Sequence, residues 1–530
     1  MPLDVSSALC QEFLELKSQG SFSAWLTRLQ SLSLIEGQML PIRHVTTADH
    51  PLRAIVCVVG PSDKPESSNL PPAADARAFG DFSVDASDTG PESVSSFCET
   101  ARQVFQARPT RRFLHGFQMR GSMLELWMFD CSGAFSSEKF DIAEQPGLLV
   151  TIVASYAMMT DEEAGFNSFI QHDQMGSYVT FGGNDDQAER LYLDKPIAAP
   201  QYLVGPGTAC YAAKTSTSQS AGLVVKFAWR DEVAHTEWEL LELTRKRKVW
   251  GVIRALGCQD LDSIRGLREG LRFDQPYTFT DGNATFQDDA PEKDASFTNR
   301  TFSCVAASPL GWPINQFRTI TELLEACRDV AKALRSLYQD GKILHRDICI
   351  KNLIIPVHRN EGDAAGILID LDGALDLEKG PARSGELVGS EGFMAIGILT
   401  GDSHTYRHDL ESLFYVFLWI SICKDREYDD ARALSQQPET SRLWGWCSMK
   451  FRAVARNKGV DMSPQGFETV LGEFLPEFEH VKGLAREFRQ LLFPVHNEGI
   501  WIGSERDQEG VDRLYDGMID AFNWAISSQM

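Results

Sequence analysis

Strand patterns precede long helix patterns from about residue 191 onward in this 530-residue chain. Residues 191–227 and 302–305 concentrate apolar residues in short runs, as strands do, with a helical stretch between them. Long helical patterns then follow over residues 319–338, 409–423, 467–478 and 511–527. Because strands and helices are segregated along the chain rather than alternating, we predict an α+β fold in which a β-rich lobe precedes a helical lobe.

The first 190 residues change composition twice. Residues 60–97 are rich in Gly, Pro, Ser, Asp and Ala, which predicts a flexible linker. Beyond it, paired strands are expected at 113–119 and 123–129, and a buried helix at 147–159. The expected segments are a helical and strand segment at 1–59, the linker at 60–97, an N-terminal module at 98–189, an N-lobe at 190–307 with an acidic insertion at 273–299, and a C-lobe with C-terminal helices at 308–530.

The net charge of −23 argues against a nucleic-acid-binding protein, which needs clustered Lys and Arg, and against electrostatic docking on anionic lipid. The 11 cysteines form no C-x-x-C pair, which favours reduced thiols over disulfides or a zinc site. The N-terminus has no secretory signal pattern, and the longest apolar stretches are too short to span a bilayer. We therefore expect an intracellular protein, cytoplasmic or nuclear, that binds neither nucleic acid nor membrane.

Residues 345–352 read HRDICIKN after a short apolar run. In this pattern Asp347 is placed to orient the proton of an attacking hydroxyl, and Asn352, on the same loop, to hold a magnesium ion. His345, Arg346 and Asp347 alone are compatible with an ion-paired surface turn. The intact spacing to the asparagine favours a catalytic loop for phosphoryl transfer.

A second acidic motif, LIDLDGA, spans residues 368–374. A short apolar strand delivers Asp370 at its end, with Asp372 two residues on, and Mg²⁺ prefers such carboxylate oxygens. Taken alone, the segment is equally compatible with a pair of turn-capping aspartates. Its position after the catalytic loop favours a metal site made by Asn352, Asp370 and Asp372.

Upstream, Gly205 and Gly207 form a G-x-G turn between two strand patterns. Glycines let a backbone approach phosphate groups closely, although such turns also connect ordinary hairpins. Lys226 follows inside an apolar strand, at the position of the lysine that contacts nucleotide phosphates in protein kinases. A buried lysine needs a charge partner. Glu237 is our choice because it shares a helix face with apolar residues, whereas Glu239, the alternative, is expected to face solvent.

These motifs resemble those of the fungal-type protein kinases. The shared pattern reads H-R-D-I…N, L-I-D-x-D-x-A, G-[TS]-x-x-F-M-A and H-D-L-E-S-x-x-Y-V, at residues 345–352, 368–374, 389–395 and 408–416. The resemblance also includes the runs RRFLHGF at 111–117 and LWMFDCSG at 126–133. It therefore covers roughly residues 98–425.

The resemblance implies a bilobal protein kinase-like fold, ATP with Mg²⁺ as cofactors, and a protein substrate phosphorylated on Ser or Thr. The acidity around residues 361–389 suggests a basic peptide as that substrate. Asp409, which otherwise caps a helix, is implied to anchor the catalytic-loop backbone, and Arg346 to bind a phosphate on Ser384 or Ser390. The residues with implied catalytic or nucleotide-binding roles are Asp347, Lys226, Glu237, Asn352, Lys351, Gly205 and Gly207.

The chain departs from the usual kinase pattern in four places. Cys210 replaces the third glycine of the phosphate loop, and Asp372 replaces the glycine of D-F-G. Residues 395–397 read AIG where an A-P-E acid braces the activation segment, and Cys131 stands where the family tends to carry arginine. No catalytic group is lost. The alternative interpretations are a pseudokinase scaffold that binds nucleotide with little turnover, and a small-molecule phosphotransferase.

Overall fold

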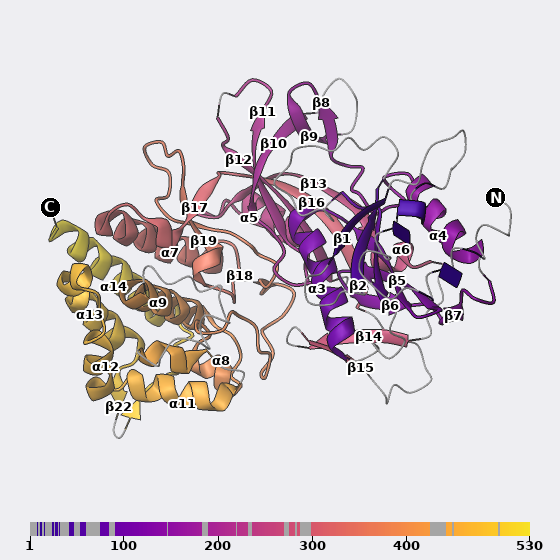
Figure 1. The fold of residues 1–530 in the computed structure, drawn as a ribbon. Helices are drawn as coiled ribbons and strands as arrows, with labels where there is room; N and C mark the ends of the chain where they lie inside the picture. The colour runs from indigo at the N-terminus through magenta and orange to yellow at the C-terminus, as the bar shows by residue number, and fades with distance from the viewer. Residues whose placement is uncertain are drawn as a thin grey trace. The chain divides into compact units, whose positions relative to one another are not determined.

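The chain is described in two compact units, each considered by itself. Unit 1 comprises Met1–Val233 and Gly257–Ala306, and unit 2 comprises Ala234–Leu256 and Ala307–Met530. Both contain strands and helices (Figure 1), which confirms the predicted mixture of α and β structure. The computed structural model describes residues 8, 11–12, 15, 24–25, 27–29, 31, 42–46, 53–59, 75–83, 91–145, 147–182, 189–218, 220–231, 236–269, 275–280, 283–286, 298–423, 441–447, 450–496 and 499–529.

The first sheet of unit 1, here called the N-terminal sheet, has the strand order β1-β2-β3-β4-β5-β6-β14-β15, with β7 pairing with β5. Only β3 and β4 run parallel among these pairs, because α3 (Pro91–Ala107) provides the crossover between them. Its strands are β1 (Ile42–Thr46), β2 (Arg53–Val58), β3 (Ala78–Ser83), β4 (Phe113–Arg120), β5 (Met123–Asp130), β6 (Gly133–Ser136), β7 (Phe140–Asp141), β14 (Gln275–Thr280) and β15 (Asn283–Phe286). The predicted pairing of the strands near 113–119 and 123–129 is confirmed.

Alternation along these strands divides the apolar side chains between two cores, because successive residues of a strand point to opposite faces. On β3, Phe82 joins the cluster covered by α4 (Gly147–Met158), whereas Phe79 joins the cluster covered by α3. Likewise on β5, Leu124 belongs to the first cluster and Trp127 to the second. A helix therefore covers each face of the N-terminal sheet. The helix predicted at 147–159 is present as α4, but the expectation that it is buried is wrong, because only the face with Leu149 and Val153 packs on the sheet and Met158 is exposed.

The second sheet has the strand order β13-β16-β12-β11-β10-β9-β8. Its strands are β8 (Gln171–Asp173), β9 (Gly176–Phe181), β10 (Glu189–Ala198), β11 (Ala209–Thr215), β12 (Leu223–Asp231), β13 (Arg254–Ser263) and β16 (Arg300–Ser308). On β12, Val225 and Phe227 point into the core of this sheet, so Lys226 between them points to the opposite face. Cys210 on β11 is the cross-strand partner of Lys226.

Unit 2 is built mainly from helices around α9, whose 18 residues are all buried. Both α7 and α13 pack against α9. Thr319 caps α7 by accepting a hydrogen bond from the N–H of Glu322 at 3.1 Å. None of the helices in the described ranges is long and apolar enough to span a membrane. The helices are α5 (Glu237–Lys246), α7 (Ile320–Gln339), α8 (Ile396–Thr400), α9 (Tyr406–Cys423), α11 (Phe451–Asp461), α12 (Pro464–Leu471), α13 (Lys482–Leu492) and α14 (Gln508–Ser527).

Short strands complete unit 2. They form the three small sheets β17-β19-β20, β18-β21 and β22-β23. These strands are β17 (Gly311–Pro313), β18 (Ile343–Leu344), β19 (Leu353–Pro356), β20 (Ile367–Leu368), β21 (Leu375–Asp376), β22 (Val495–His496) and β23 (Gly499–Ile500). Both β18-β21 and β19-β20 flank the motifs singled out in the sequence, so they position the loops that carry them.

Two expectations about local structure are wrong. The linker predicted at 60–97 contains strand β3 and the start of α3, because pairing with β2 and β4 orders a run that looked too polar to fold. Residues 60–74 and 84–90 of that linker lie outside the described residues. The helix predicted at 467–478 ends at Leu471, since Gly472 follows and a 3₁₀ helix starts at Pro476. The acidic insertion predicted at 273–299 contains strands β14 and β15. Strand β14 pairs with β6 and β15 pairs with β14, so the two strands extend the N-terminal sheet.

Close backbone packing between α7 and β20 gives a test of unit 2. A Cβ atom on Gly366 would lie 2.2 Å from the backbone oxygen of Ala326, whereas one on Gly459, inside α11, meets no atom within 4 Å. We expect Gly366→Ala to lower the free energy of unfolding by about 1–3 kcal/mol. Gly459→Ala is expected to raise it by up to about 1 kcal/mol through helix propensity. Urea denaturation followed by near-ultraviolet circular dichroism measures both, and equal midpoints would contradict this packing.

Candidate active site

The two acidic motifs meet because their flanking strands pair. Strand β18 precedes the catalytic loop and pairs with β21, while β19 follows it and pairs with β20. The N–H of Ile369 donates to the backbone oxygen of Asn352 at 3.0 Å, and Nε2 of His345 lies 3.1 Å from the backbone oxygen of Ile369. The residue preceding Asp370 is therefore joined to both ends of the HRDICIKN segment.

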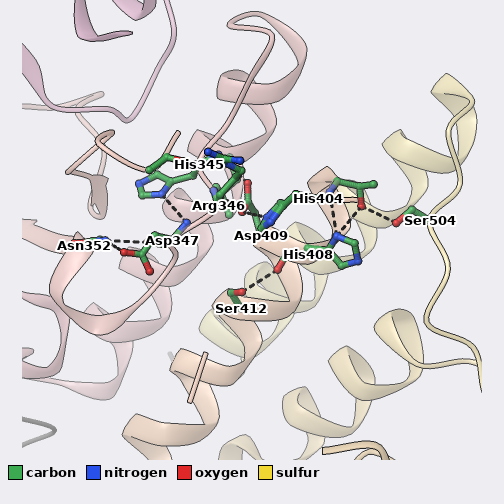
Figure 2. Close-up of polar contacts among 12 residues, drawn as sticks. His345, Arg346, Asp347, Asn352, His404, His408, Asp409, Ser412 and Ser504 are labelled. Carbon is green, nitrogen blue, oxygen red and sulfur yellow. Dashed lines mark hydrogen bonds and ion pairs between the residues drawn. The ribbon is translucent and has the colours of Figure 1, made fainter. Parts of the chain in front are cut away.

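Asp409, in the first turn of α9, holds the backbone at the start of this loop (Figure 2). Its Oδ2 accepts the N–H of His345 at 3.0 Å, and its Oδ1 accepts the N–H of Arg346 at 2.9 Å. Nε2 of His404 also donates to Oδ1, at 2.9 Å. Burial alone would raise the pKa of the Asp409 carboxyl, but the charge of His404 and these hydrogen bonds outweigh it and lower the pKa. These contacts hold Arg346 at a φ of 67°, a conformation that non-glycine residues rarely adopt.

Asp347 has hydrogen-bond donors on both carboxylate oxygens. The amide Nδ2 of Asn352 donates to its Oδ2 at 3.0 Å and to its backbone oxygen at 2.9 Å. Its Oδ1 accepts the N–H of Ser390 at 2.8 Å and the Ser390 hydroxyl at 2.7 Å. Asp347 is thus fixed between its own loop and the segment that carries Ser390.

Arg346 already has an acidic partner. Its Nη1 donates to Oε2 of Glu386 at 2.9 Å, and its Nε donates to the backbone oxygen of Gly373 at 2.7 Å. The hydroxyl of Ser384 lies 2.9 Å from that of Ser403. Arg346 was expected to bind a phosphate on Ser384 or Ser390. In the structure Arg346 instead pairs with Glu386, and Ser390 contacts Asp347. Phosphorylation of Ser384 or Ser390 stays a prediction.

Glu237, Asp370 and Asp372 form an acidic group in unit 2. One carboxylate oxygen from each lies within 4.8 Å of the other two. Glu237 is buried at the start of α5, on the same face as Leu240 and Leu241, as predicted. Carboxylates this close repel one another unless a cation lies among them, so the group fits a hard divalent cation.

The remaining predicted residues of unit 1 lie on and beside the glycine turn. Gly205 has a φ of 137° and Gly207 a φ of 53°, both in the region that favours glycine. Lys226 lies on β12, opposite Cys210. Because Lys226 and Glu237 belong to different units, their pairing stays a prediction. Lys351, in unit 2, is exposed on a 3₁₀ turn that follows Asp347.

Glu411 braces the activation segment. The acid that usually does so, at the A-P-E position, is absent from residues 395–397 of this chain. The fully buried Glu411 carboxylate accepts the N–H of Ile396 at 2.7 Å and the hydroxyl of Tyr415 at 2.7 Å, and it pairs with Arg407. Gly397 occupies the position of the missing acid, where a Cβ would lie 2.6 Å from Nε2 of His408. The sequence analysis missed Glu411, and the four-residue spacing of Arg407, Glu411 and Tyr415 on one helix was the available signal.

Lys458, on α11, is a second residue that the sequence analysis missed. Its fully buried ammonium donates to the backbone oxygens of Gly392 and Met394 at 2.8 and 2.7 Å. It also lies over the rings of Tyr415 and Trp446, 3.9 and 5.1 Å from their centroids. Burial lowers the pKa of Lys458 to about 7. No local pattern marks this lysine, because the backbone oxygens to which it donates lie more than sixty residues away in the sequence.

The comparison with known families agrees with this geometry. A family model described as fungal protein kinase matches residues 57–421. The chain belongs to the fungal protein kinase family. The match begins in β2 of the N-terminal sheet and ends in α9, so it includes the glycine turn, the catalytic loop and Asp409 of this kinase. A search of curated proteins finds no match to the chain.

His408 provides a pH test of the α9 region. Burial lowers the pKa of His408 to about 4, and its Nδ1 accepts the N–H of Thr405 at 3.0 Å, which protonation would prevent. An unfolded histidine has a pKa of about 6.5, so between these values the unfolded chain binds the extra proton and stability falls as pH drops. Between pH 6.5 and 4, we expect the free energy of unfolding to fall by about 3 kcal/mol more in the wild type than in His408→Gln.

Urea denaturation at several pH values within that range measures the effect. His480→Gln, at an exposed position, serves as the matched control and should lose as much stability as the wild type. An identical pH dependence in the wild type and His408→Gln would contradict a buried, neutral His408.

Lys458 provides a test of the activation segment. Lys458→Met keeps the length of the side chain but removes its donors, which leaves the oxygens of Gly392 and Met394 without this partner. Hydrogen bonds to charged groups contribute about 1.5–3 kcal/mol each, so we expect faster hydrogen exchange over residues 389–397 and at least a tenfold rise in the KM for a protein substrate. Lys450→Met, at an exposed position beside the same helix, is the control. Unchanged exchange in Lys458→Met would rule out this brace.

Proposed function

We propose that this kinase transfers the γ-phosphate of ATP to a Ser or Thr hydroxyl of a protein substrate, in a reaction that depends on Mg²⁺. The observation that carries the proposal is the fixed carboxylate of Asp347, held by Asn352 on one oxygen and by Ser390 on the other. A base that orients the attacking hydroxyl must be held in place in this way.

The hydrogen bonds of Asp347 leave room for a substrate hydroxyl. A carboxylate offers about four lone-pair positions. Three donors approach this one, namely Nδ2 of Asn352 and both the N–H and the hydroxyl of Ser390. One position is left for the proton of an incoming hydroxyl. Asp347 orients that hydroxyl toward the γ-phosphate and accepts its proton as the new O–P bond forms and the bond from the γ-phosphorus to ADP breaks.

The acidic group supports a role for magnesium. Asp370, Asp372 and Glu237 present carboxylate oxygens, the ligands that Mg²⁺ prefers, within a space that one ion can occupy. These carboxylates would hold the ion, which would neutralise charge on the nucleotide phosphates when bound. Asn352, whose loop is hydrogen-bonded to the residue before Asp370, is proposed as a further ligand.

The remaining assignments concern the nucleotide and the transferred group. Gly205 and Gly207 are proposed to cover the phosphates with their backbone, because their φ values allow close approach. Lys226, with Glu237 as its partner, is proposed to contact the α- and β-phosphates, and Lys351 the transferred phosphoryl group.

Contacts of the activation segment bear on regulation and on the substrate. Glu386 supplies the carboxylate that Arg346 binds, so the proposed activity requires no phosphate on Ser384. A phosphate on Ser390 would remove its hydroxyl proton from Asp347 and place negative charge beside that carboxylate, so it would inhibit. The exposed acids Glu361 and Asp363 support a basic peptide as substrate.

Replacing the base tests the proposal directly. Asp347→Asn removes the proton acceptor while keeping the shape of the side chain, so we expect transfer from ATP to a Ser/Thr peptide library to fall by about 10²–10⁴-fold. Asp520→Asn, the same change at an exposed aspartate of α14, should leave transfer unchanged. Radiolabelled ATP measures transfer, and thermal-shift titration with Mg-ATP measures binding.

The same assays separate the other functions. Binding of Mg-ATP by the wild type without any transfer would favour a pseudokinase scaffold. Transfer to small hydroxylated compounds but not to peptides would favour a small-molecule phosphotransferase. Full activity in Asp347→Asn would show that the base is assigned wrongly.

A further inference from the structure

The glycine turn is connected to the N-terminal sheet by several contacts. Residues 199–204, here called the approach segment, link the end of β10 to Gly205. Within it, Leu203 packs against the core cluster under α3, which includes Phe97 and Trp127. The guanidinium of Arg102, on α3, also donates to the backbone oxygen of Gln201 at 3.4 Å. The approach segment therefore rests on the N-terminal sheet and its helix rather than projecting as a free hairpin.

A hydrogen bond then joins the glycine turn itself to the β5–β6 turn, residues 130–133. The N–H of Gly205 donates to the backbone oxygen of Cys131 at 2.9 Å. On the other side of the glycine turn, the N–H of Trp229, on β12, donates to the backbone oxygen of Pro206 at 2.7 Å. The turn is thus held from both sides, by the N-terminal sheet at Gly205 and by the second sheet at Pro206.

The β5–β6 turn is itself rigidly held. The fully buried carboxylate of Asp130 receives two hydrogen bonds from Arg268, from Nε at 2.8 Å and from Nη2 at 2.6 Å. Asp130 also accepts the N–H of Ser132 at 2.8 Å, which closes the turn. Arg268 in turn lies 3.6 Å from the centroid of the Phe135 ring. A buried, bidentate ion pair of this kind fixes geometry, because breaking it leaves a charge without its partner.

The side chain of Cys131 adds a third point of attachment. It is buried in the core cluster of the second sheet, together with Ala209 and Phe227. Ala209 is the first residue of β11, two positions after Gly207. The β5–β6 turn therefore presents its backbone oxygen to Gly205, and its Cys131 side chain belongs to the core cluster that also contains Ala209, just beyond the other end of the glycine turn.

We propose that the β5–β6 turn positions the glycine turn for nucleotide binding, which makes the N-terminal sheet part of the nucleotide-binding machinery. Asp130, Arg268 and Leu203 act as positioning residues, since their contacts hold the backbone of the β5–β6 turn and of the approach segment. The proposal rests on the proposed function, in which Gly205 and Gly207 cover the phosphates. A glycine-containing loop loses much conformational entropy when it is ordered, and these contacts order it before ATP arrives.

The physical consequence is a change in nucleotide affinity without a change in chemistry. Loosening the glycine turn raises the cost of ordering it on binding, but it leaves Asp347 and the acidic group, which lie in unit 2, as they are. The expected signature is therefore a higher KM for ATP with an unchanged kcat and an unchanged KM for the peptide substrate. A general loss of folded protein would lower the apparent kcat instead.

Leu203→Ala and Asp130→Asn are the test variants, and Ile197→Ala is the control. Ile197 lies on β10 just before the approach segment with half of its side-chain surface exposed, so its truncation removes similar apolar volume without releasing an anchor. We expect both test variants to raise the KM for ATP about tenfold, with kcat within a factor of two, and the control to match the wild type. Equal KM values for ATP in all four proteins would overturn the proposal.

Hydrogen exchange measured by mass spectrometry keeps the test independent of activity. Peptides covering residues 201–208 should exchange faster in Leu203→Ala and Asp130→Asn than in Ile197→Ala, while peptides from α9 should be unchanged. If the wild type transfers no phosphate but exchange changes as expected, the proposed function fails and the positioning role stands. If exchange over 201–208 is the same in all the variants, the positioning role fails whatever the activity. Should Asp130→Asn not fold, Leu203→Ala decides alone.

Discussion

The carboxylate of Asp409 is the contact on which the site in unit 2 depends. It accepts the backbone N–H groups of two successive loop residues, His345 and Arg346, and so holds Arg346 in a left-handed conformation. That conformation turns the chain so that the next residue, Asp347, presents its carboxylate to Asn352 and Ser390. Strain of this kind costs about 1–3 kcal/mol and persists only where surrounding contacts over-determine it. Asp409 and the β18-β21 pair provide those contacts.

The first turns of α9 concentrate polar and charged groups that a buried helix normally excludes. Arg407, His408, Asp409 and Glu411 are all buried, and each has a defined polar partner. Such networks contribute little net stability compared with apolar packing, but they allow few alternative arrangements. Here they connect α9 to the catalytic loop through Asp409 and to the activation segment through Glu411. One helix thereby sets the positions of both segments relative to each other.

Local patterns predicted the parts of the fold and site that depend on short spacings. The five-residue separation of Asp347 and Asn352 predicted their shared loop, and Glu237 was placed correctly on the buried face of α5. The sequence could not show that Glu386 pairs with Arg346, that Lys458 holds the activation segment, or that β3 lies within the expected linker. Each of these depends on contacts between residues distant in sequence, which composition and periodicity do not encode.

The family match covers the elements that hold the two loops in place. It runs from β2 to α9 and therefore contains both elements that hold loops in place, the β5–β6 turn in unit 1 and Asp409 in unit 2. Lys458 and the helices α11 to α14 lie beyond it. A glycine turn that rests on the N-terminal sheet cannot keep its conformation without that sheet, because its own glycines do not favour one conformation over another. If the glycine turn covers the nucleotide phosphates as proposed, the strands before the kinase core help to hold it, and the family match includes them.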